Sequence, residues 1–460
     1  MHADQIHSGR VSSLNQCDSA GGAYVLYWMQ QSQRATWNHA LEYAIGRANE
    51  LGQPLLVCFG LMDDYPEANL RHYTFMLEGL RDVGEALAQR GITFVLERGD
   101  PAEVALKISK KASLLVCDRG YLTSQKRWRK QVAAEAHCPA LEVESDVVVP
   151  VHLASEKREF AARTLRPKLT RLWPEHLHKV PRLIVQKKSL DLASRGLNWR
   201  DPEGVVRKLK VDRSVAAVTE HFHGGTVAAE KIFRRFCTEL LPDYKATRNQ
   251  PQTNNVSHIS KYLHFGQISP LWLALEARRQ ANGNAENIAS FIDELLVRRE
   301  LSMNWVEFTE NYESYESLPD WSRRTLAEHA ADPRPYLYSR EQLETAATHD
   351  PYWNAAMNEM RFTGYMHNHM RMYWGKKILE WSPTPEEAHA TALAINNKFF
   401  LDGRDANSFA NIGWVFGQHD RPWFERPVFG KVRYMNAAGL ERKCDIRAYV
   451  AKVSALTTAA

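Results

Sequence analysis

The chain has 460 residues, of which 44% are hydrophobic and 25% are charged, and its formal net charge is +5. This length predicts two domains, and the composition is that of an ordinary globular protein. It contains no run of about 20 apolar residues and no secretory signal, which excludes a membrane-spanning or exported class. The six cysteines form no Cys-x-x-Cys pair, so we expect no metal site and a reduced, cytoplasmic setting.

The first half of the chain is predicted to be an α/β domain. Residues 1–22 are expected to be a flexible N-terminus, and residues 23–155 alternate between apolar, β-rich runs and helical patterns. The runs lie at 23–29, 54–61, 92–97, 112–118 and 140–150. Five strands separated by helices predict a doubly wound parallel sheet, which binds ligands at the carboxyl ends of its strands. Asp100 and Pro101 predict the start of one helix.

The second half is predicted to be helical. Residues 156–226 are basic and rich in proline, as in an interdomain connector that is partly helical. From residue 227 to residue 460 the apolar residues recur with the period of an α-helix, and we expect an all-helical domain.

Three stretches of the helical half carry polar groups suited to chemistry. The loop 246–269 enters a helix through Ser257 and Ser260, which favours either a phosphate site or an ordinary capped loop. Glu294 and Arg298 are four residues apart, as on a salt-bridged helix surface. The segment "LDGRDA" reads as a turn whose acidic groups need a cationic partner such as Arg371 if they are buried.

Tryptophans and basic residues form two further patterns. Trp374 and Trp381 lie about two helical turns apart, and with Trp353 they suit either a core stripe or electron hopping between indoles. Residues 421–460 hold eight Lys or Arg against three acids, interleaved with aromatic residues. This second pattern favours a nucleic-acid partner over a merely solvated face.

Taken together, these segments resemble a known family. "REFAARTLRPKL", "YLHFGQIS", "DELLVRRE", "THDPYWNAA", "RMYWGKKILEW", "LDGRDANSFANIGW" and "RPVFGKVRYM" are similar to the signature segments of class II cyclobutane-pyrimidine-dimer photolyases, within the photolyase/cryptochrome superfamily. The resemblance covers residues from about 23 to 455 and implies an N-terminal antenna domain, a connector and a helical FAD domain. It also implies light-driven repair, in which reduced FAD gives one electron to a pyrimidine dimer flipped out of UV-damaged DNA.

The resemblance implies a set of residues that hold FAD, with Arg371 paired to Asp402 and Asn396 facing the flavin. The expected cofactor-binding residues are Tyr244, Val256, Ser257, His258, Ile259, Ser260, Arg371, Asn396, Asp402, Gly403 and Arg404. Light-driven reduction of FAD is expected to use Trp381 nearest the flavin, followed by Trp353 or Trp374. A second chromophore, 8-hydroxydeazaflavin or methenyltetrahydrofolate, is implied without a residue that decides between them.

A second set is implied to act on the dimer and its DNA, by a monomer with no membrane contact. Glu294 is expected to hydrogen-bond the dimer, Trp414 to wall it and Asn396 to complete the catalytic group. The expected DNA-binding residues are Arg248, Glu294, Arg298, Asn368, Trp414, Arg421 and Arg433. Val297 and Arg298 stand where many photolyases have Trp, and Asn368-His369 also departs from the usual class II text.

Two alternatives remain at this point. A (6-4) photolyase would need active-site histidines, for which His367 and His369 are candidates. A cryptochrome-like blue-light receptor would use the same FAD and tryptophans, but Glu294, Trp414 and the basic segment favour repair.

Overall fold

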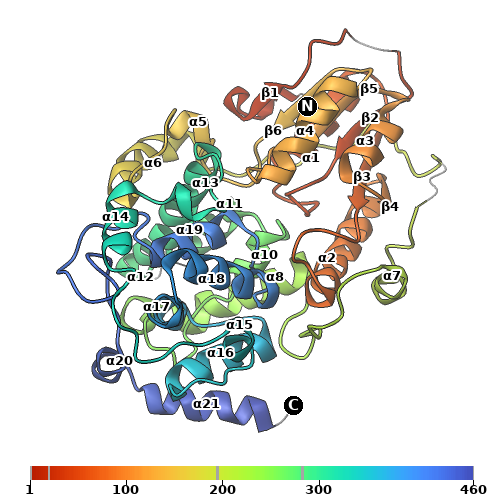
Figure 1. The fold of residues 1–460 in the computed structure, drawn as a ribbon. Helices are drawn as coiled ribbons and strands as arrows, with labels where there is room; N and C mark the ends of the chain where they lie inside the picture. Colours follow the sequence, from red (N-terminus) through yellow and green to blue (C-terminus); the bar gives the residue numbers. More distant parts are fainter. Residues whose placement is uncertain (1–2, 19–20, 193–195, 281–283, 459–460) are drawn as a thin grey trace.

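The computed structural model describes residues 3–18, 21–192, 196–280 and 284–458. Figure 1 shows an α/β part, residues 3–155, above a larger helical part, residues 226–458. Among the described residues, no helix has both the length and the apolar character needed to cross a membrane.

The α/β part is built on one sheet of six strands. In spatial order these are β1 (Val11–Ser13), β6 (Ala140–Val143), β5 (Ala112–Asp118), β2 (Tyr24–Trp28), β3 (Leu55–Leu61) and β4 (Thr93–Arg98). The last five are parallel, as predicted. Strands β2, β3 and β5 are buried along their whole length, which explains their unbroken apolar sequences.

The described part of the N-terminal segment contains secondary structure where the sequence predicted a flexible N-terminus. Val11–Ser13 pairs antiparallel with β6 and adds an edge strand that the sequence did not indicate. Arg10 is 3% exposed and donates to the main-chain carbonyls of Glu144 and Val147 at 2.9 and 3.1 Å. A three-residue strand is too short to produce a readable alternation.

Helices cover both faces of the sheet. The first pair, α1 (His39–Glu50) and α2 (Leu70–Gln89), packs with Val25 and Tyr27 of β2. The second pair, α3 (Pro101–Ser109) and α4 (Thr123–Glu135), packs with Leu26 and Trp28 on the opposite face. The predicted start of α3 is confirmed, because Asp100 accepts the N–H of Ala102 at 2.8 Å and Pro101 follows it.

The rest of the chain is helical. The α/β part ends with α5 (Val151–Ala154), and the connecting stretch contains α6 (Ala162–His176) and α7 (Pro202–Lys208). The helical part contains α8 (Thr226–Arg235), α9 (Tyr244–Thr247), α10 (Ser260–His264), α11 (Pro270–Arg279), α12 (Ala285–Ile292), α13 (Arg299–Glu307), α14 (Asp320–Glu328), α15 (Arg340–Glu344), α16 (Pro351–Thr363), α17 (Asn368–Trp381), α18 (Pro385–Phe399), α19 (Ala406–Val415), α20 (Ala437–Lys443) and α21 (Ile446–Thr458).

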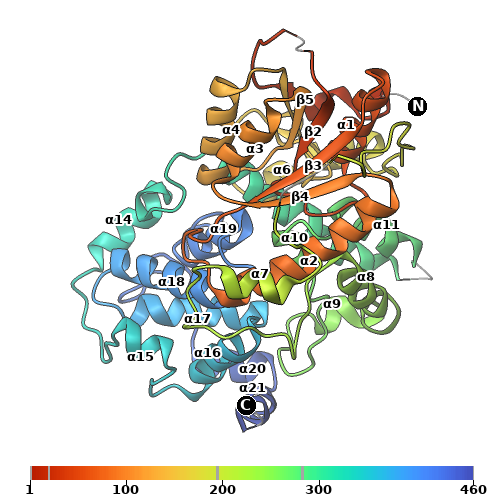
Figure 2. The same ribbon diagram turned by 90° about the vertical axis from the view of Figure 1, so that its right-hand side faces the viewer.

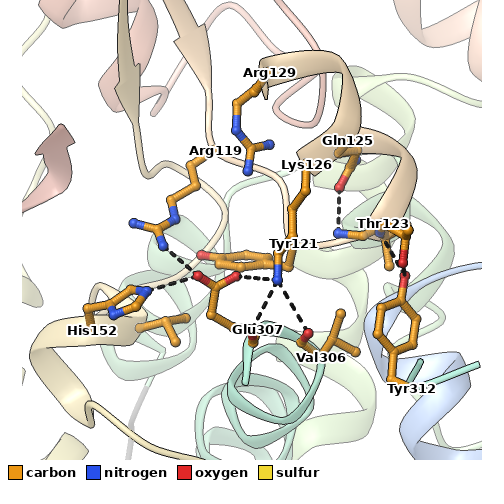
Figure 3. A network of polar contacts seen from close by, with 12 residues as sticks. Arg119, Tyr121, Thr123, Gln125, Lys126, Arg129, His152, Val306, Glu307 and Tyr312 are labelled. Atoms are coloured by element: carbon orange, nitrogen blue, oxygen red, sulfur yellow. Dashed lines mark hydrogen bonds and ion pairs between the residues drawn. The ribbon is translucent and has the colours of Figure 1, made fainter. Parts of the chain in front are cut away.

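The two parts are joined by buried polar contacts. In Figure 2, α2 lies between the sheet and the helical part, and Arg71 of α2 donates to the carbonyls of Met360 and Phe399 at 3.1 and 2.6 Å. Figure 3 shows a second junction at Glu307, the last residue of α13. Its carboxylate accepts from Arg119, Lys126 and His152 of the α/β side at 2.6, 2.9 and 2.9 Å.

Candidate cofactor and DNA site

An ion pair lies at the centre of the helical part. Arg371, in the first turn of α17, donates through Nη2 to both carboxylate oxygens of Asp402, at 2.8 and 3.1 Å. Burial opposes ionisation of Asp402, but Arg371, the Ser260 hydroxyl and Lys261 together hold the pKa of Asp402 below its ordinary value. The pairing expected from the sequence is therefore present, and the carboxylate is charged.

The serine loop reaches this ion pair at the start of α10. Ser260 begins α10 and contacts Asp402, and His258 just before it has a φ of 53°. A histidine in the left-handed region is strained, as are many residues at ligand sites. The Nδ1 atom of His258 is buried without a hydrogen-bond partner.

Lys261 adds a second cation beside Asp402, which the sequence analysis missed. The residue is 1% exposed, and its ammonium donates to the carbonyl of His258 at 2.9 Å. Burial and the charge of Arg371 lower the pKa of Lys261 to about 7, although Asp402 opposes them. The position of Lys261 directly after Ser260 is the sequence feature from which its place in the site could have been predicted. Two basic groups, Arg371 and Lys261, thus lie around the Asp402 carboxylate. We call these three residues and the side chains packed on them the cofactor chamber.

The turn between α18 and α19 forms another wall. Asn396 is 3% exposed and donates to the Ser408 hydroxyl at 2.6 Å. A side chain on Gly403 would meet the carbonyl of Asn396 at 2.9 Å, so only glycine permits this close approach. Arg404 donates to the main-chain carbonyl of Asn397, and its guanidinium lies 3.1 Å from Nε2 of His72 in α2, so it is directed toward the α/β part.

Aromatic rings pack beside the serine loop and its neighbours. Tyr244 is 8% exposed and packs edge-on against Phe236 and Phe291, with ring centroids 5.5 and 5.8 Å apart. Tyr365 lies 4.7 Å from the ring of His258 and is also near Lys261. Of the remaining predicted loop residues, Ile259 is buried, and Val256 and Ser257 are partly exposed.

The three tryptophans form a buried series whose order differs from the expected one. Trp374 packs on Phe400 at 6.4 Å, and the Phe400 ring lies 3.6 Å from the guanidinium carbon of Arg371. Trp353 donates to the carbonyl of Trp374 at 3.0 Å and lies 5.7 Å from Trp381. Trp374 rather than Trp381 therefore lies next to the ion pair, whereas the expected order had Trp381 nearest the flavin.

Trp381 lies at the outer end of this series. Its ring contacts Tyr338 and His349 at 5.4 and 5.3 Å, and His349 is exposed. The sequence spacing was correct, but it could not tell which end of the helix faces the chamber.

Glu294 lies in a π-helical turn, Asp293–Arg298, where the sequence predicted an ordinary helix. Such turns often occur at functional sites. Its carboxylate accepts from Arg248 at 2.7 Å and from Arg298 at 2.9 Å. Three of the predicted DNA-binding residues thus form one partly exposed cluster, and its carboxylate is held in place by two arginines.

A second cluster surrounds Trp414 at the end of α19. The Arg433 guanidinium lies 5.3 Å from the Trp414 ring and 4.1 Å from the Trp423 ring, and it donates to Asp420 at 2.8 Å. The buried ammonium of Lys376 also lies 5.1 Å from the Trp414 ring. Arg421 and Phe424 are exposed, Phe424 to 90%. Cations stacked on aromatic rings are typical of nucleic-acid surfaces.

The His-Asn-His run starts α17. His367 is 1% exposed, and its Nδ1 accepts the N–H of His369 at 3.2 Å, which caps the helix. Burial lowers the pKa of His367 to about 3. Asn368 is exposed between them. His367 is thus a neutral helix cap, which is a structural role for one of the two histidines considered for a (6-4) photolyase.

A cavity lies at the carboxyl ends of the strands, between the two parts. Its lining includes Met29, Gln30 and Trp128 from the sheet side and His264 and Arg404 from the helical side. Asp118 at the end of β5 accepts the N–H groups of residues 30–32 at 2.9 to 3.1 Å, which holds that loop against the cavity. Both side-chain amide atoms of Gln30 are buried without partners.

Comparisons with known proteins agree on one family. The family model described as DNA photolyase matches residues 25–185. The chain is 49% identical over 452 residues to the deoxyribodipyrimidine photo-lyase of Methanothermobacter thermautotrophicus, covering 98% of this chain and 99% of that protein.

Solved structures share the fold at low sequence identity. A class III photolyase from Agrobacterium tumefaciens aligns with a TM-score of 0.72 at 17% identity, over 95% of this chain and 87% of that one. An archaeal photolyase from Sulfolobus tokodaii, solved with two FAD molecules, aligns with a TM-score of 0.68 at 16% identity, over 93% and 89%.

Proposed function

The chain belongs to the DNA photolyase family, and we propose that it is a class II enzyme that splits cyclobutane pyrimidine dimers in UV-damaged DNA with light. The observation that carries the proposal is the Arg371–Asp402 pair, which Ser260 contacts at the start of α10, with the Glu294 and Trp414 clusters on partly exposed helices of the same part. Assignment to class II rests on the order of the signature segments quoted above.

The chamber around this ion pair fits FAD. Two basic groups, the half-buried Arg371 and the buried Lys261, face one carboxylate, so a further negative charge would be favoured there. His258 offers an unpaired buried nitrogen beside the start of α10. We assign the pyrophosphate to the Ser257–Ser260 loop and the flavin to the side of Arg371, Asn396 and Asp402. When bound and reduced, FAD supplies the light-excited electron that opens the cyclobutane ring.

The residues of this chain prepare the dimer for that electron. Arg248 and Arg298 hold the Glu294 carboxylate in one orientation, from which it can bond the dimer bases and favour their reduced form. Trp414, positioned between Lys376 and Arg433, provides a flat apolar wall for a flipped base. Arg421 and Arg433 contact backbone phosphates, and Asn368 touches the damaged strand.

The tryptophans serve a separate task. We propose that a reductant in solution, such as a thiol, gives electrons that reach oxidised FAD by way of Trp381, Trp353 and Trp374, in that order. The support is the chain of ring and hydrogen-bond contacts that ends on Phe400 under Arg371.

We assign the strand-end cavity to the antenna chromophore. The unpaired amide of Gln30 suits a planar ring whose edge carries both donors and acceptors. Both 8-hydroxydeazaflavin and methenyltetrahydrofolate meet this requirement. Reconstitution with each, followed by excitation spectra of the wild type and of Gln30→Leu, decides between them.

One assay tests the proposed function. Reduced, FAD-loaded protein is incubated with a duplex that contains a thymine dimer, with and without blue light, and a (6-4) duplex is treated in parallel. We expect light-dependent splitting of the thymine dimer alone. Equal persistence of the dimer in light and dark would overturn the proposal.

A further inference from the structure

We propose that His7, Glu175 and His176 form a binding site for a divalent transition-metal ion, and that this ion is Zn²⁺. The three ligand atoms lie within 4.8 Å of one another. His7 belongs to the N-terminal segment, and the other two residues end α6, so the metal would fasten these two segments together. No short sequence motif predicts this site, because its ligands come from distant parts of the sequence.

His176 provides the independent observation. Its side chain is 1% exposed, and neither ring nitrogen has a hydrogen-bond partner. Buried polar groups are nearly always paired, and an unpaired one costs stability. The His7 ring is only 4.7 Å away, centroid to centroid, and is tilted by 53°. A metal ion between the two rings would supply the partner that His176 lacks.

The donor set selects the metal. Two imidazoles and one carboxylate are typical ligands of Zn²⁺, whereas Mg²⁺ and Ca²⁺ prefer oxygen atoms. Tetrahedral bonds of about 2.0–2.2 Å bring ligand atoms to about 3.3 Å from one another, so the side chains must close slightly. His7 and Glu175 are exposed, which gives them room to rotate and leaves a fourth position to water.

The neighbours support and oppose the ion in identifiable ways. His178 contacts the carbonyl of Glu175 through Nε2 at 2.8 Å, which holds the end of α6. Arg10 places a positive charge near His176, which opposes a cation there. The Nδ1 of His7 accepts the N–H of Gly9 at 3.0 Å. A neutral imidazole has one free lone pair, so coordination exchanges this exposed hydrogen bond for the metal bond.

Binding would stabilise the folded N-terminus. An ion that binds only the folded chain raises its stability by mass action. The clasp would hold the edge strand β1, which follows His7 closely, and the connector helix α6 in one arrangement. The site lies apart from the cofactor chamber, so repair of DNA need not depend on it.

The test uses the full chain without an affinity tag, stripped by a chelator and titrated with ZnCl₂. We expect calorimetry to show one Zn²⁺ per chain and thermal unfolding to shift upward with Zn²⁺, but not with Mg²⁺. Co²⁺ should give the visible absorption of a tetrahedral site. His7→Ala and Glu175→Gln should each weaken binding by about 10- to 100-fold.

Two comparisons keep the test decisive. His7 and Glu175 are exposed, so their variants should fold even if His176→Ala does not. His221→Ala removes an exposed histidine outside the cluster and should bind as the wild type does. Equal binding by wild type and His7→Ala, or no binding by the wild type, would overturn the site.

Discussion

The indole N–H of Trp353 donates a hydrogen bond to the main-chain carbonyl of Trp374 at 3.0 Å. This contact joins α16 to α17 at the middle of the tryptophan series, between Phe400 on one side and Trp381 on the other. It gives the series a direction, because only Trp374 adjoins the ring that lies under Arg371.

Replacing the innermost tryptophan should have the largest effect on light-driven reduction of bound FAD. We expect Trp374→Phe to abolish rapid photoreduction and Trp381→Phe to leave a short-lived first step, since the two inner indoles remain. Transient absorption measures both. Repair by chemically reduced enzyme should stay near the wild-type rate in each variant, as in the control Trp272→Phe. A larger loss of photoreduction in Trp381→Phe than in Trp374→Phe would contradict the proposed order and place Trp381 nearer the flavin.

Lys261 should make FAD affinity depend on pH. Burial lowers the pKa of Lys261 to about 7, and an anionic cofactor would favour its charged form. FAD binding should therefore be strongest below pH 7 and weaken as pH rises, by at most about tenfold per pH unit for one proton. Fluorescence titration should show a flat profile for Lys261→Met and the wild-type profile for exposed Lys231→Met. The same slope in both variants would exclude Lys261.

Glu294 should affect chemistry more than binding. Glu294→Ala removes the carboxylate that neutralises Arg248 and Arg298, so affinity for DNA should hold or rise. Repair under saturating light should fall by about 100-fold, the scale for loss of one preorganised group. Binding assays and single-turnover repair separate the two effects. Glu286→Ala, at an exposed pair with Lys245, serves as the control. Weaker DNA binding with unchanged repair would contradict this role.

Arg433 should contribute to DNA binding through charge. We expect Arg433→Ala to weaken binding of damaged and undamaged duplex alike and to reduce the slope of log affinity against log salt by about 1. Fluorescence anisotropy at several salt concentrations measures this slope. Arg235→Ala removes an exposed arginine of α8 and should leave it unchanged. An unaltered slope in Arg433→Ala would place that side chain away from the phosphates.

Glu307 should stabilise the junction of the two parts only above acidic pH. Burial alone would raise its pKa, but Arg119 and Lys126 bring the pKa of Glu307 from 4.5 down to about 2. A lowered pKa stabilises the fold above the unfolded value, and this contribution disappears as pH falls from about 5 to 2.

The shift corresponds to about 3 kcal/mol at neutral pH. Urea unfolding of Glu307→Gln should show this loss at pH 7 and little loss near pH 2. Exposed Glu310→Gln is the matched control. An equal loss at both pH values would mean that the junction depends on shape rather than charge.

Local patterns were sufficient for the elements and for one pair at the site. The five parallel strands follow from apolar runs, and the start of α3 follows from Asp100 and Pro101, because these signals act within a few residues. The Arg371–Asp402 pair followed from the family's segments together with the cost of an unpaired buried acid.

Other features required contacts between distant segments. Antiparallel pairing of Val11–Ser13 depends on an edge that β6 offers, and the π-helical turn at Glu294 depends on its surroundings. The sequence by itself determined the architecture, the family and the residue types of the site. Only the tertiary structure decided the order of the tryptophans, the position of Lys261 and the contact between His7 and His176. The reason is that helical spacing shows which residues share a face but not which neighbour that face contacts.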